Sequence, residues 1–415
     1  MKKKLYFLLG GYPVVSQSFL YNQITEVIKQ DMYDVRIIVL NKKPGTVHPA
    51  YESLNEKVIY FSTGREHGAA SKLPMALKAF GKLLFTNPGV LFKSINFLKY
   101  GRESFNATYL ILAEQFLKVK PDLIHCHFGT TARVIADFKD MHVITCPLIS
   151  SFHGKDITVY PKKFGNAYYT RLFHTGEMFT ANSRFITNKM IDAGCPSGQI
   201  VKIPMCLNTS QFHYRETPPV RETFKILTVG RFVEKKGYQY SLKAAALLKK
   251  AGVKFMYHLI GEGPLLEEMK GLARELGIQD DVVFHGAMMQ HKVIEHYRSA
   301  DVFLLPSVTA ADGDTEGQGM VLQEAQAIGV PIVATLHNGF PDSIIDGTTG
   351  FLVPERDFQA LYEKLVLLAG DIELCSRMGK AGRAFVESHF DSKIIGKELN
   401  AVYNRMLEMT NEPAP

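Results

Sequence analysis

The chain has 415 residues, of which 46% are hydrophobic and 21% are charged, and its formal net charge is +7. This is the composition of an ordinary globular protein, and it excludes a disordered chain, a collagen-like repeat and a coiled coil. No apolar run reaches the roughly 18–20 residues that a membrane-spanning helix requires. At about 100–200 residues per domain, the length favours two domains or three small ones.

The first predicted element is the apolar run Leu5–Leu9, which follows three lysines. Gly10 and Gly11 end this run before it reaches the roughly 7–15 apolar residues of a signal peptide, so we interpret it as a β-strand. Further strands of the first half are predicted at residues 35–40, 123–127, 148–152 and 178–181, with helices at 18–30 and 184–193.

The second half repeats this alternation of short apolar runs and amphipathic segments. Strands are predicted at residues 225–229, 254–260, 282–285, 302–305 and 332–334, and helices at 237–250, 264–276, 292–299 and 320–328. Strands that alternate with helices indicate parallel sheets covered on both faces. Residues 214–222 are polar and contain two adjacent prolines, which is typical of a linker.

We therefore predict an α/β protein with two Rossmann-like, doubly wound domains that face each other across a cleft. The first domain is expected to span residues 1–210 and the second residues 211–394. The end of the chain has a helical pattern, and a last helix, at about residues 395–415, is predicted to return to the first domain.

Charge divides the chain in the same way. Residues 1–210 hold 26 Lys+Arg and 14 Asp+Glu, a net of +12, whereas residues 211–415 hold 22 and 27, a net of −5. A basic half indicates an anionic partner, and both nucleic acid and a membrane surface fit. The scattered Cys126, Cys146, Cys195, Cys206 and Cys375 form no C-x-x-C pair, which is typical of reduced thiols in a cytosol.

A basic loop follows the predicted strand that ends at Val229. Gly230 and Arg231 begin this loop, and Lys236 lies five residues after the arginine, just before a helix. A guanidinium fork and an ammonium at the end of a strand can hold a diphosphate, and the helix N-terminus adds amide donors. An isolated pair of this spacing would more often be a solvated basic turn, but its place at a strand end favours the diphosphate.

The loop after residues 302–305 combines carboxylates with glycines. Glu316 lies in the loop and Glu324 in the helix that follows, while Gly317 and Gly319 permit close approach of a ligand to the backbone. Ionised carboxylates accept hydrogen bonds from a polyhydroxylated ligand. The alternative is a helix-terminal acid together with a surface glutamate.

Several polar groups are weaker candidates. Asp312 and Asp314 have the D-x-D spacing of a metal site, but no third ligand is evident, so we interpret them as solvated acids and predict no metal. His153 ends a strand and could be either structural or functional. His125 and His127 share one strand face without further ligands, which favours a structural role.

These stretches together resemble a known enzyme family. Four of them are similar to the donor-domain signature of family-four retaining glycosyltransferases. They are Gly230–Gly237, Ile260–Pro264, Ala300–Ser307 and Glu316–Pro331. Three further stretches resemble bacterial exopolysaccharide enzymes of the colanic-acid type: Tyr12–Ile24, Phe152–Ile157 and Ala311–Gly317. The similarity spans nearly the whole chain and implies the GT-B fold.

The resemblance also implies a role for particular residues. The residues expected to be catalytic are His153, Arg231, Lys236 and Glu316. The donor would be bound by Gly11, Gly230, Arg231, Lys236, Gly261, Gly286, Met288, Glu316, Gly319, Met320, Val321 and Glu324. Arg231 and Lys236 would hold the diphosphate, Glu316 the sugar hydroxyls and Glu324 the ribose. Pro204–Asn208 departs from the family pattern and receives no role, and Gln318 replaces a common Phe or Pro, which leaves the donor sugar open.

The implied activity is retaining transfer of a hexose from a nucleotide-diphosphate sugar, with UDP favoured, to a lipid-linked oligosaccharide. The implied pathway makes an exopolysaccharide or another surface polysaccharide, such as a capsule or lipopolysaccharide. We expect no cofactor, no required metal and no nucleic acid, and a monomer or weak dimer at the cytoplasmic face of an anionic inner membrane.

Two other functions stay open. One is a nucleotide-sugar 2-epimerase of the same fold, and the other is a non-catalytic protein that binds a nucleotide sugar or nucleic acid.

Overall fold

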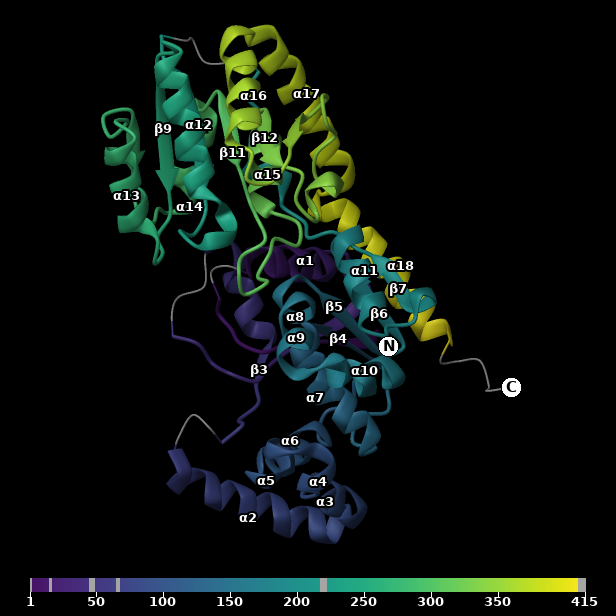
Figure 1. The fold of residues 1–415 in the computed structure, drawn as a ribbon. Coiled ribbons are helices and arrows are strands. Elements are labelled where there is room, and N and C mark those ends of the chain that lie inside the picture. Colours follow the sequence, from purple (N-terminus) through teal and green to yellow (C-terminus); the bar gives the residue numbers. More distant parts are fainter. Residues whose placement is uncertain (1, 15–16, 45–48, 65–67, 217–221, 410–415) are drawn as a thin grey trace. The chain divides into compact units, whose positions relative to one another are not determined.

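The computed structural model describes residues 2–14, 17–44, 49–64, 68–216 and 222–409 (Figure 1). Contacts divide the chain into two compact units. Unit 1 comprises Met1–Asn182, Thr187–Ile203 and Gly396–Pro415, and unit 2 comprises Ser183–Ile186 and Pro204–Ile395. Each unit contains one parallel sheet, as predicted.

Unit 1 is built on a seven-stranded sheet in the order β3-β2-β1-β4-β5-β6-β7. Every residue of β4 and β5 is buried, because helices cover both faces of a parallel sheet. The strands are β1 Lys3–Leu9, β2 Tyr33–Val39, β3 Val58–Tyr60, β4 Leu123–His127, β5 Leu148–Phe152, β6 Met178–Ala181 and β7 Ile200–Lys202.

The helices of unit 1 include a group that stands at one end of the unit, away from the sheet (Figure 1). This group comprises α2 Gly68–Thr86, α3 Pro88–Ser94, α4 Phe97–Tyr100, α5 Arg102–Phe105 and α6 Thr108–Phe116. The other helices are α1 Ser18–Lys29, α7 Gly129–Asp140, α8 Lys155–Thr158, α9 Tyr160–Phe164, α10 Thr170–Thr175 and α11 Arg184–Asp192.

Unit 2 is built on a six-stranded sheet in the order β10-β9-β8-β11-β12-β13, with an apolar core on each face. Its strands are β8 Phe224–Val229, β9 Phe255–Ile260, β10 Val282–Phe284, β11 Val302–Leu305, β12 Ile332–Thr335 and β13 Gly350–Val353. Its helices are α12 Tyr238–Lys250, α13 Leu266–Glu275, α14 Gln290–Ser299, α15 Met320–Ile328, α16 Phe358–Gly370 and α17 Ile372–His389.

The last helix, α18 (Ser392–Met409), begins in unit 2 and joins unit 1 from Gly396 onward. The Tyr403 hydroxyl lies 2.7 Å from Nδ1 of His125 on β4, and the Tyr33 hydroxyl donates to Asn404 Oδ1 over 2.6 Å. The prediction that the end of the chain returns to the first domain is confirmed, although residues 410–415 lie outside the described part.

The predicted linker lies only partly within the described residues, since 217–221 fall outside them. At its start, the Arg215 N–H donates to the carbonyl of Ile328 over 3.0 Å, and the ring of Tyr214 lies against Gly329. The start of this segment is therefore packed against unit 2. Among the described residues, no helix is long and apolar enough to cross a bilayer.

Candidate active site

Three glycines connect the carboxyl ends of β8, β9 and β10 in unit 2. The Gly230 N–H donates to the Ile260 carbonyl over 2.9 Å, and the Gly261 N–H donates to the Gly286 carbonyl over 2.8 Å. A Cβ on Gly261 would lie 1.9 Å from the Gly230 oxygen, so only glycine fits there. Gly230, Gly261 and Gly286, which are predicted to bind the donor, therefore meet at the carboxyl ends of the strands. Ligands of α/β folds bind at this end of the sheet.

The two predicted diphosphate ligands differ in their surroundings. Arg231 is exposed, whereas Lys236 is buried at the end of a short 3₁₀ turn, Glu234–Lys236, that leads into α12. A buried ammonium requires a partner. Lys236 Nζ lies 3.2 Å from Glu316 Oε1 and forms an ion pair with it.

Glu316 is a carboxylate held between two lysines. Its Oε1 also lies 3.5 Å from Lys235 Nζ. Burial raises the pKa of Glu316, but the charges of Lys236 and Lys235 outweigh it and lower the pKa to about 2. Glu316 is therefore ionised at neutral pH and is an acceptor for hydroxyl groups.

Gly319 precedes α15 in the left-handed conformation, with φ of 79°. A Cβ there would lie 2.8 Å from the ring of Phe340, so glycine is required for space as well as for conformation. Met320 and Val321 form the first turn of α15. The first amides of a helix have no partner within it and favour an anion.

Glu324 lies one turn farther along α15. Its Oε2 accepts a hydrogen bond from the Tyr297 hydroxyl over 3.0 Å. Burial raises the pKa of Glu324 to about 7, against the lowering effects of Tyr297 and Lys236. The pKa values of these two carboxyl groups are therefore shifted in opposite directions.

Glu316 and its neighbour Thr315 are held by side chains that no motif in the sequence indicated. His337 Nε2 lies 2.7 Å from Thr315 Oγ1 and accepts from the Glu316 N–H over 3.2 Å, and its Nδ1 lies 2.5 Å from Glu355 Oε1. Lys235 also binds the Thr315 carbonyl. These residues come from separate loops, so no spacing in the sequence indicated them.

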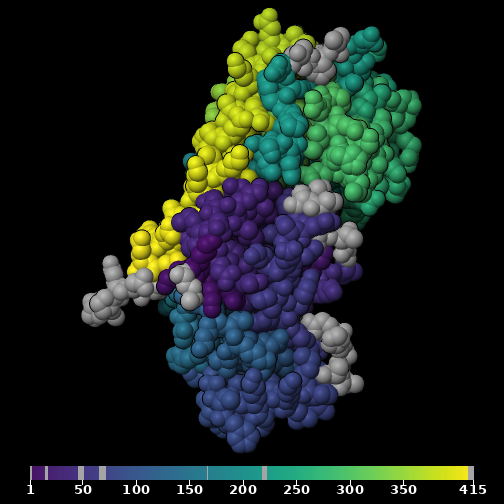
Figure 2. Space-filling view, turned by 180° about the vertical axis from the view of Figure 1, so that it is seen from behind, coloured from purple at the N-terminus to yellow at the C-terminus, as the bar shows by residue number. Residues whose placement is uncertain are grey.

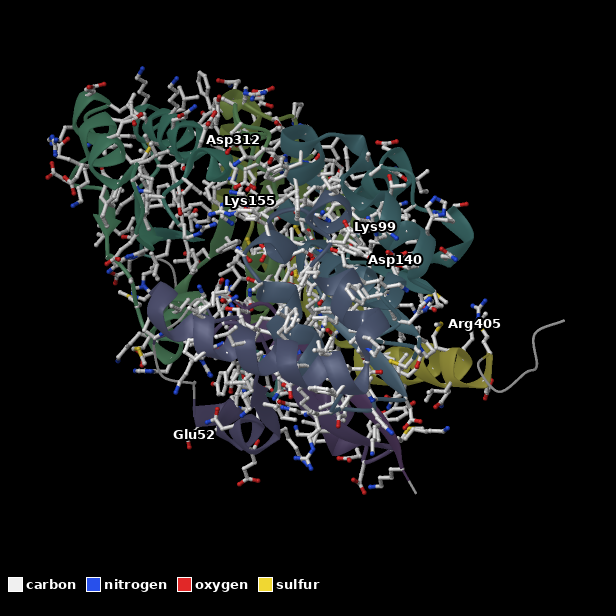
Figure 3. All side chains as sticks on the ribbon, turned by 90° about the horizontal axis from the view of Figure 1, so that it is seen from below. Glu52, Lys99, Asp140, Lys155, Asp312 and Arg405 are labelled. Atoms are coloured by element: carbon white, nitrogen blue, oxygen red, sulfur yellow. The ribbon has the colours of Figure 1, made fainter. Side chains whose placement is uncertain are left out.

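The two acids of the D-x-D pair have hydrogen-bond partners in their own loop, and Asp314 also has one outside it. Asp314 Oδ1 lies 3.2 Å from Lys235 Nζ and accepts from the Thr315 N–H over 2.9 Å. Asp312, labelled in Figure 3, is exposed, and its Oδ1 accepts from the Asp314 N–H. Asp314 therefore has an ammonium as its partner.

Gln318 is fully buried, and both ends of its amide bind one backbone segment. Its Oε1 accepts from the Met205 N–H over 2.7 Å and its Nε2 donates to the Met205 carbonyl over 2.9 Å. The two departures from the family pattern are therefore in contact. Met288, predicted to line the base pocket, is half-buried and packs on the apolar core of unit 2.

His153, in unit 1, is half-buried and contacts the rings of neighbouring residues. Its Nε2 is 3.1 Å from Nδ1 of His127, and its ring meets that of Phe19 edge-on. Burial lowers the pKa of His153 to about 3, so the ring is neutral. Asp156 accepts from the N–H groups of His153 and Gly154 and fixes the turn.

His125 and His127 have the structural surroundings expected of them. His125 Nδ1 lies 2.7 Å from the Tyr403 hydroxyl and its Nε2 2.7 Å from Ser151 Oγ, and both rings are buried. Gly11 follows β1, and a Cβ on it would lie 3.1 Å from Lys43.

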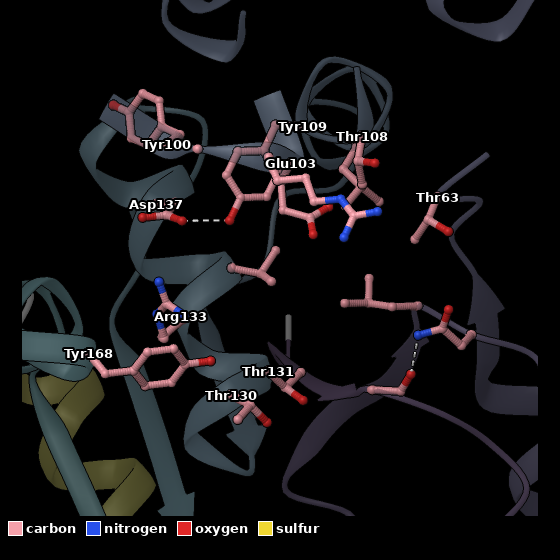
Figure 4. Close-up of a pocket in the computed structure, with 17 residues that line it drawn as sticks. Thr63, Tyr100, Glu103, Thr108, Tyr109, Thr130, Thr131, Arg133, Asp137 and Tyr168 are labelled. Carbon is pink, nitrogen blue, oxygen red and sulfur yellow. Dashed lines mark hydrogen bonds between the residues drawn. The ribbon is translucent and has the colours of Figure 1, made fainter. Parts of the chain in front are cut away.

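A cavity of about 440 Å³ opens in unit 1 at the ends of β1 and β2 and the start of α7 (Figure 4). The guanidinium of Arg133 lies 3.8 Å above the centre of the Tyr168 ring, and the Tyr109 hydroxyl donates to Asp137 over 2.5 Å. The lining also includes four threonine hydroxyls, those of Thr63, Thr108, Thr130 and Thr131. Such a lining suits a polar ligand, and no motif in the sequence indicates it.

Two family models match the chain. "Glycosyltransferase Family 4" matches residues 57–211, and "Glycosyl transferases group 1" matches residues 211–385. Over 414 residues, 97% of this chain and the whole relative, the sequence is 33% identical to the "Amylovoran biosynthesis glycosyltransferase AmsK" of Erwinia amylovora. The chain belongs to the family 4 glycosyltransferases. The predicted transferase activity is therefore confirmed.

This glycosyltransferase is also similar to a second exopolysaccharide enzyme and to a solved structure. It is 31% identical over 403 residues to the "Putative colanic acid biosynthesis glycosyltransferase WcaL" of Escherichia coli, covering 95% of this chain and 98% of that one. The crystal structure of HepE from Anabaena in complex with UDP matches with a TM-score of 0.71 at 17% identity, over 97% of this chain and 100% of that one. The GT-B fold is confirmed by this likeness.

Proposed function

We propose that this glycosyltransferase moves a hexose, with retention, from a nucleotide-diphosphate sugar to a lipid-linked oligosaccharide in exopolysaccharide synthesis. The observation that carries the proposal is the Lys236–Glu316 ion pair in the loops at the ends of β8 and β11, next to the N-terminus of α15. A cation for phosphate and an ionised acceptor for hydroxyls are the two groups that a sugar diphosphate needs.

The proposed reaction depends on electrostatic stabilisation. Arg231 and Lys236, with the first amides of α15, stabilise the negative charge that grows on the leaving diphosphate. Glu316 orients the sugar hydroxyls. The acceptor hydroxyl attacks on the face that the diphosphate leaves, and a phosphate oxygen takes its proton. In this proposal no metal is needed, because the protein supplies the positive charge.

UDP is the favoured nucleotide of the donor. The solved HepE structure holds UDP, and a second one holds UDP-glucose. Glu324 would accept the ribose hydroxyls, and Gly286 and Met288 would line the base. The exopolysaccharide pathway is supported by the amylovoran and colanic acid relatives.

The acceptor would bind in unit 1, with its glycan in the cavity of Figure 4. Threonine hydroxyls and Arg133 match sugar hydroxyls and phosphate, and tyrosine rings offer stacking faces. His153 and Gly11 would lie on the acceptor side of the reaction. Tyr100–Glu103, which also line the cavity, belong to the helical group at one end of unit 1.

That helical group would bind the membrane. Its most exposed apolar side chains are Phe85, Leu98 and Phe105, with exposed fractions of 87%, 87% and 77%. Figure 2 shows atoms of this group, in blue, at the surface of unit 1. Residues 72–120 carry eight Lys+Arg against two Asp+Glu. Exposed apolar groups among basic ones are typical of a surface that docks on anionic lipid.

The proposal is tested by donor screening followed by transfer. UDP-sugars and GDP-sugars are compared for thermal stabilisation of the protein, and the best donor is then incubated with lipid extracts that contain lipid-linked glycans. We expect a glycosylated lipid of retained anomeric configuration, formed in EDTA as well as in buffer. Lys236→Ala should lower kcat/KM by about a hundredfold or more, the scale for one preorganised group. Lys250→Ala, an exposed lysine at the end of α12, is the matched control.

Other products would overturn the proposal. An epimerised nucleotide sugar formed without acceptor would identify a 2-epimerase, and donor binding without turnover would identify a binding protein. Activity lost in EDTA and restored by Mn²⁺ would show that a metal is required, and loss of activity in Asp312→Asn with Asp314→Asn would then assign the metal to this pair.

The acceptor cavity has its own test. Arg133→Ala should raise the KM for the acceptor at least about tenfold, because a charged hydrogen-bond partner contributes about 1.5–3 kcal/mol. Binding of the nucleotide, measured by calorimetry, should not change. An unchanged acceptor KM would exclude this cavity as the acceptor site.

A further inference from the structure

Three histidines of unit 2 meet on the face of the sheet that α14 covers. His258 lies on β9, His285 directly follows β10, and His296 lies on α14. Their ring centres are 4.5–5.5 Å apart, and one ring nitrogen of each lies within 4.8 Å of the other two. We propose that these three imidazoles form a binding site for a transition-metal ion, of which Zn²⁺ is the best match.

The topology explains why three distant residues converge. Tyr257 points into the apolar core on one face of the sheet, so His258, the next residue along the strand, points to the opposite face. On that face α14 packs by Tyr297 and Val293, which brings His296 over the sheet. The N–H of His285 donates to the Leu259 carbonyl and places the residue beside β9.

The distances between the nitrogens fit a metal after small movements. Nδ1 of His258 and Nε2 of His285 are 2.9 Å apart and share a hydrogen bond. Two nitrogens bound tetrahedrally to zinc at 2.0–2.1 Å would be about 3.4 Å apart. Binding of a metal therefore requires one pair of nitrogens to move apart by about 0.5 Å and the others to approach by up to about 1.4 Å.

The charged groups around the cluster have both signs. Lys225 on β8 acts on His258 and Lys292 acts on His296, both as repelling cations, whereas Glu295 attracts positive charge next to His296. Lys292 is itself paired with Glu295. Imidazole ligands suit Zn²⁺, Cu²⁺ and Ni²⁺, whereas Ca²⁺ and Mg²⁺ require oxygen ligands, so we expect the former group to bind. All three histidines are half-buried.

The test is metal binding by the full-length chain without a histidine tag. After removal of metals by a chelator, titration with Zn²⁺ in a calorimeter should show one ion per chain with micromolar or tighter affinity. His285→Ala and His296→Ala should each weaken binding at least about tenfold, since even outer-shell changes cost that much. His291→Ala, which removes an exposed histidine from the same helix, should change nothing.

A second measurement does not depend on the variants folding. Co²⁺ in the wild-type site should give the intense visible absorption of a four-coordinate ion, and Zn²⁺ should abolish it. Absence of saturable Zn²⁺ binding in the wild type, or equal affinity in His296→Ala and His291→Ala, would overturn the proposal. Neither readout involves sugar transfer, so this inference stands or fails separately from the proposed function.

Discussion

At the scale of single residues, Lys236 forms an ion pair with Glu316. The carboxylate reduces the positive potential that a diphosphate would meet. Glu316→Gln removes this charge while keeping a hydrogen-bonding side chain. We expect the variant to bind UDP several-fold more tightly, by calorimetry, and to lose transfer by about a hundredfold or more. Weaker UDP binding by the variant would contradict this reading of the ion pair.

Glu324 allows a prediction about pH. Burial raises its pKa to about 7, whereas in an unfolded chain the value is about 4.3. Between about pH 4.3 and about pH 7 the folded protein binds more protons than the unfolded one, so the free energy of unfolding falls as pH rises. The loss that Glu324 causes reaches its full size above the folded pKa, at about pH 7.

We therefore expect Glu324→Gln to stabilise the protein, by roughly 2 kcal/mol more at about pH 8 than at about pH 5. Urea unfolding at the two pH values, compared with wild type, measures this difference. Glu268→Gln, an exposed residue of α13, is the control and should show none. An equal effect of Glu324→Gln at both pH values would show that the carboxyl group has an ordinary pKa.

The candidate site could be predicted only where it has a local signature. Arg231, Lys236 and Glu316 were identified because each follows an apolar strand and lies next to a glycine. Lys235 was missed because it adjoins Lys236, and the sequence does not show which lysine is buried. His337 was missed because its contact with Thr315 spans 22 residues and depends on how two loops fold.

At the scale of elements, the strands that the sequence did not reveal are β3, β7 and β13, and each lies at the edge of its sheet. These strands have three or four residues, and most of their side chains are only half-buried. Because an edge strand pairs with one strand only and is partly exposed, its sequence does not have to be a continuous apolar run. The central strands β4, β5, β6 and β11 were predicted with their observed bounds, because burial on both faces requires such a run.

The paired strands β4 and β5 make unit 1 sensitive to acid. Burial lowers the pKa values of His125 and His153, each to about 3, and that of His127 well below its ordinary value. These rings bind protons in the unfolded chain below about pH 6.5 but not in the folded one. Above about pH 6.5 these histidines are neutral in both states and do not reduce the free energy of unfolding. As pH falls from about 6.5 toward about 3, only the unfolded chain gains protons, and the free energy of unfolding decreases.

Between about pH 7 and pH 5, each such histidine should cost roughly 2 kcal/mol of stability. His153→Asn should therefore lose about 2 kcal/mol less than wild type over this interval. Amide hydrogen exchange of β4 reports the stability of unit 1 by itself. An equal loss in both proteins would show that His153 is protonated in the folded state.

At the scale of the whole molecule, the basic charge and the exposed apolar side chains occur in the same part of unit 1. Several lysines there are paired with acids: Lys82 lies 2.9 Å from Glu114 and Lys99 lies 2.6 Å from Asp140, the latter pair labelled in Figure 3. The apolar side chains are therefore better positions for substitution, because changing a paired lysine to an acid would also disturb the fold.

We expect the wild type to bind vesicles that contain anionic lipid, less so at high salt. Replacing Phe85, Leu98 and Phe105 by serine should weaken binding at least about a hundredfold, since each buried apolar side chain contributes about 1.5–3 kcal/mol. The same change at three exposed apolar residues of unit 2, Phe358, Leu367 and Ile372, is the matched control. Equal vesicle binding by both triple variants would exclude docking through this helical group.

The return of α18 to unit 1 has a consequence for how the protein is made. His125 and Tyr403, which are in contact, are separated by 278 residues in the sequence. A ribosome adds about 5–20 residues per second, so Tyr403 is synthesised roughly 15–55 s after His125. Throughout this interval the surface of β4 that α18 will cover remains open. Unit 1, although translated first, therefore completes its core last, and a nascent chain stalled in unit 2 would expose this surface to chaperones.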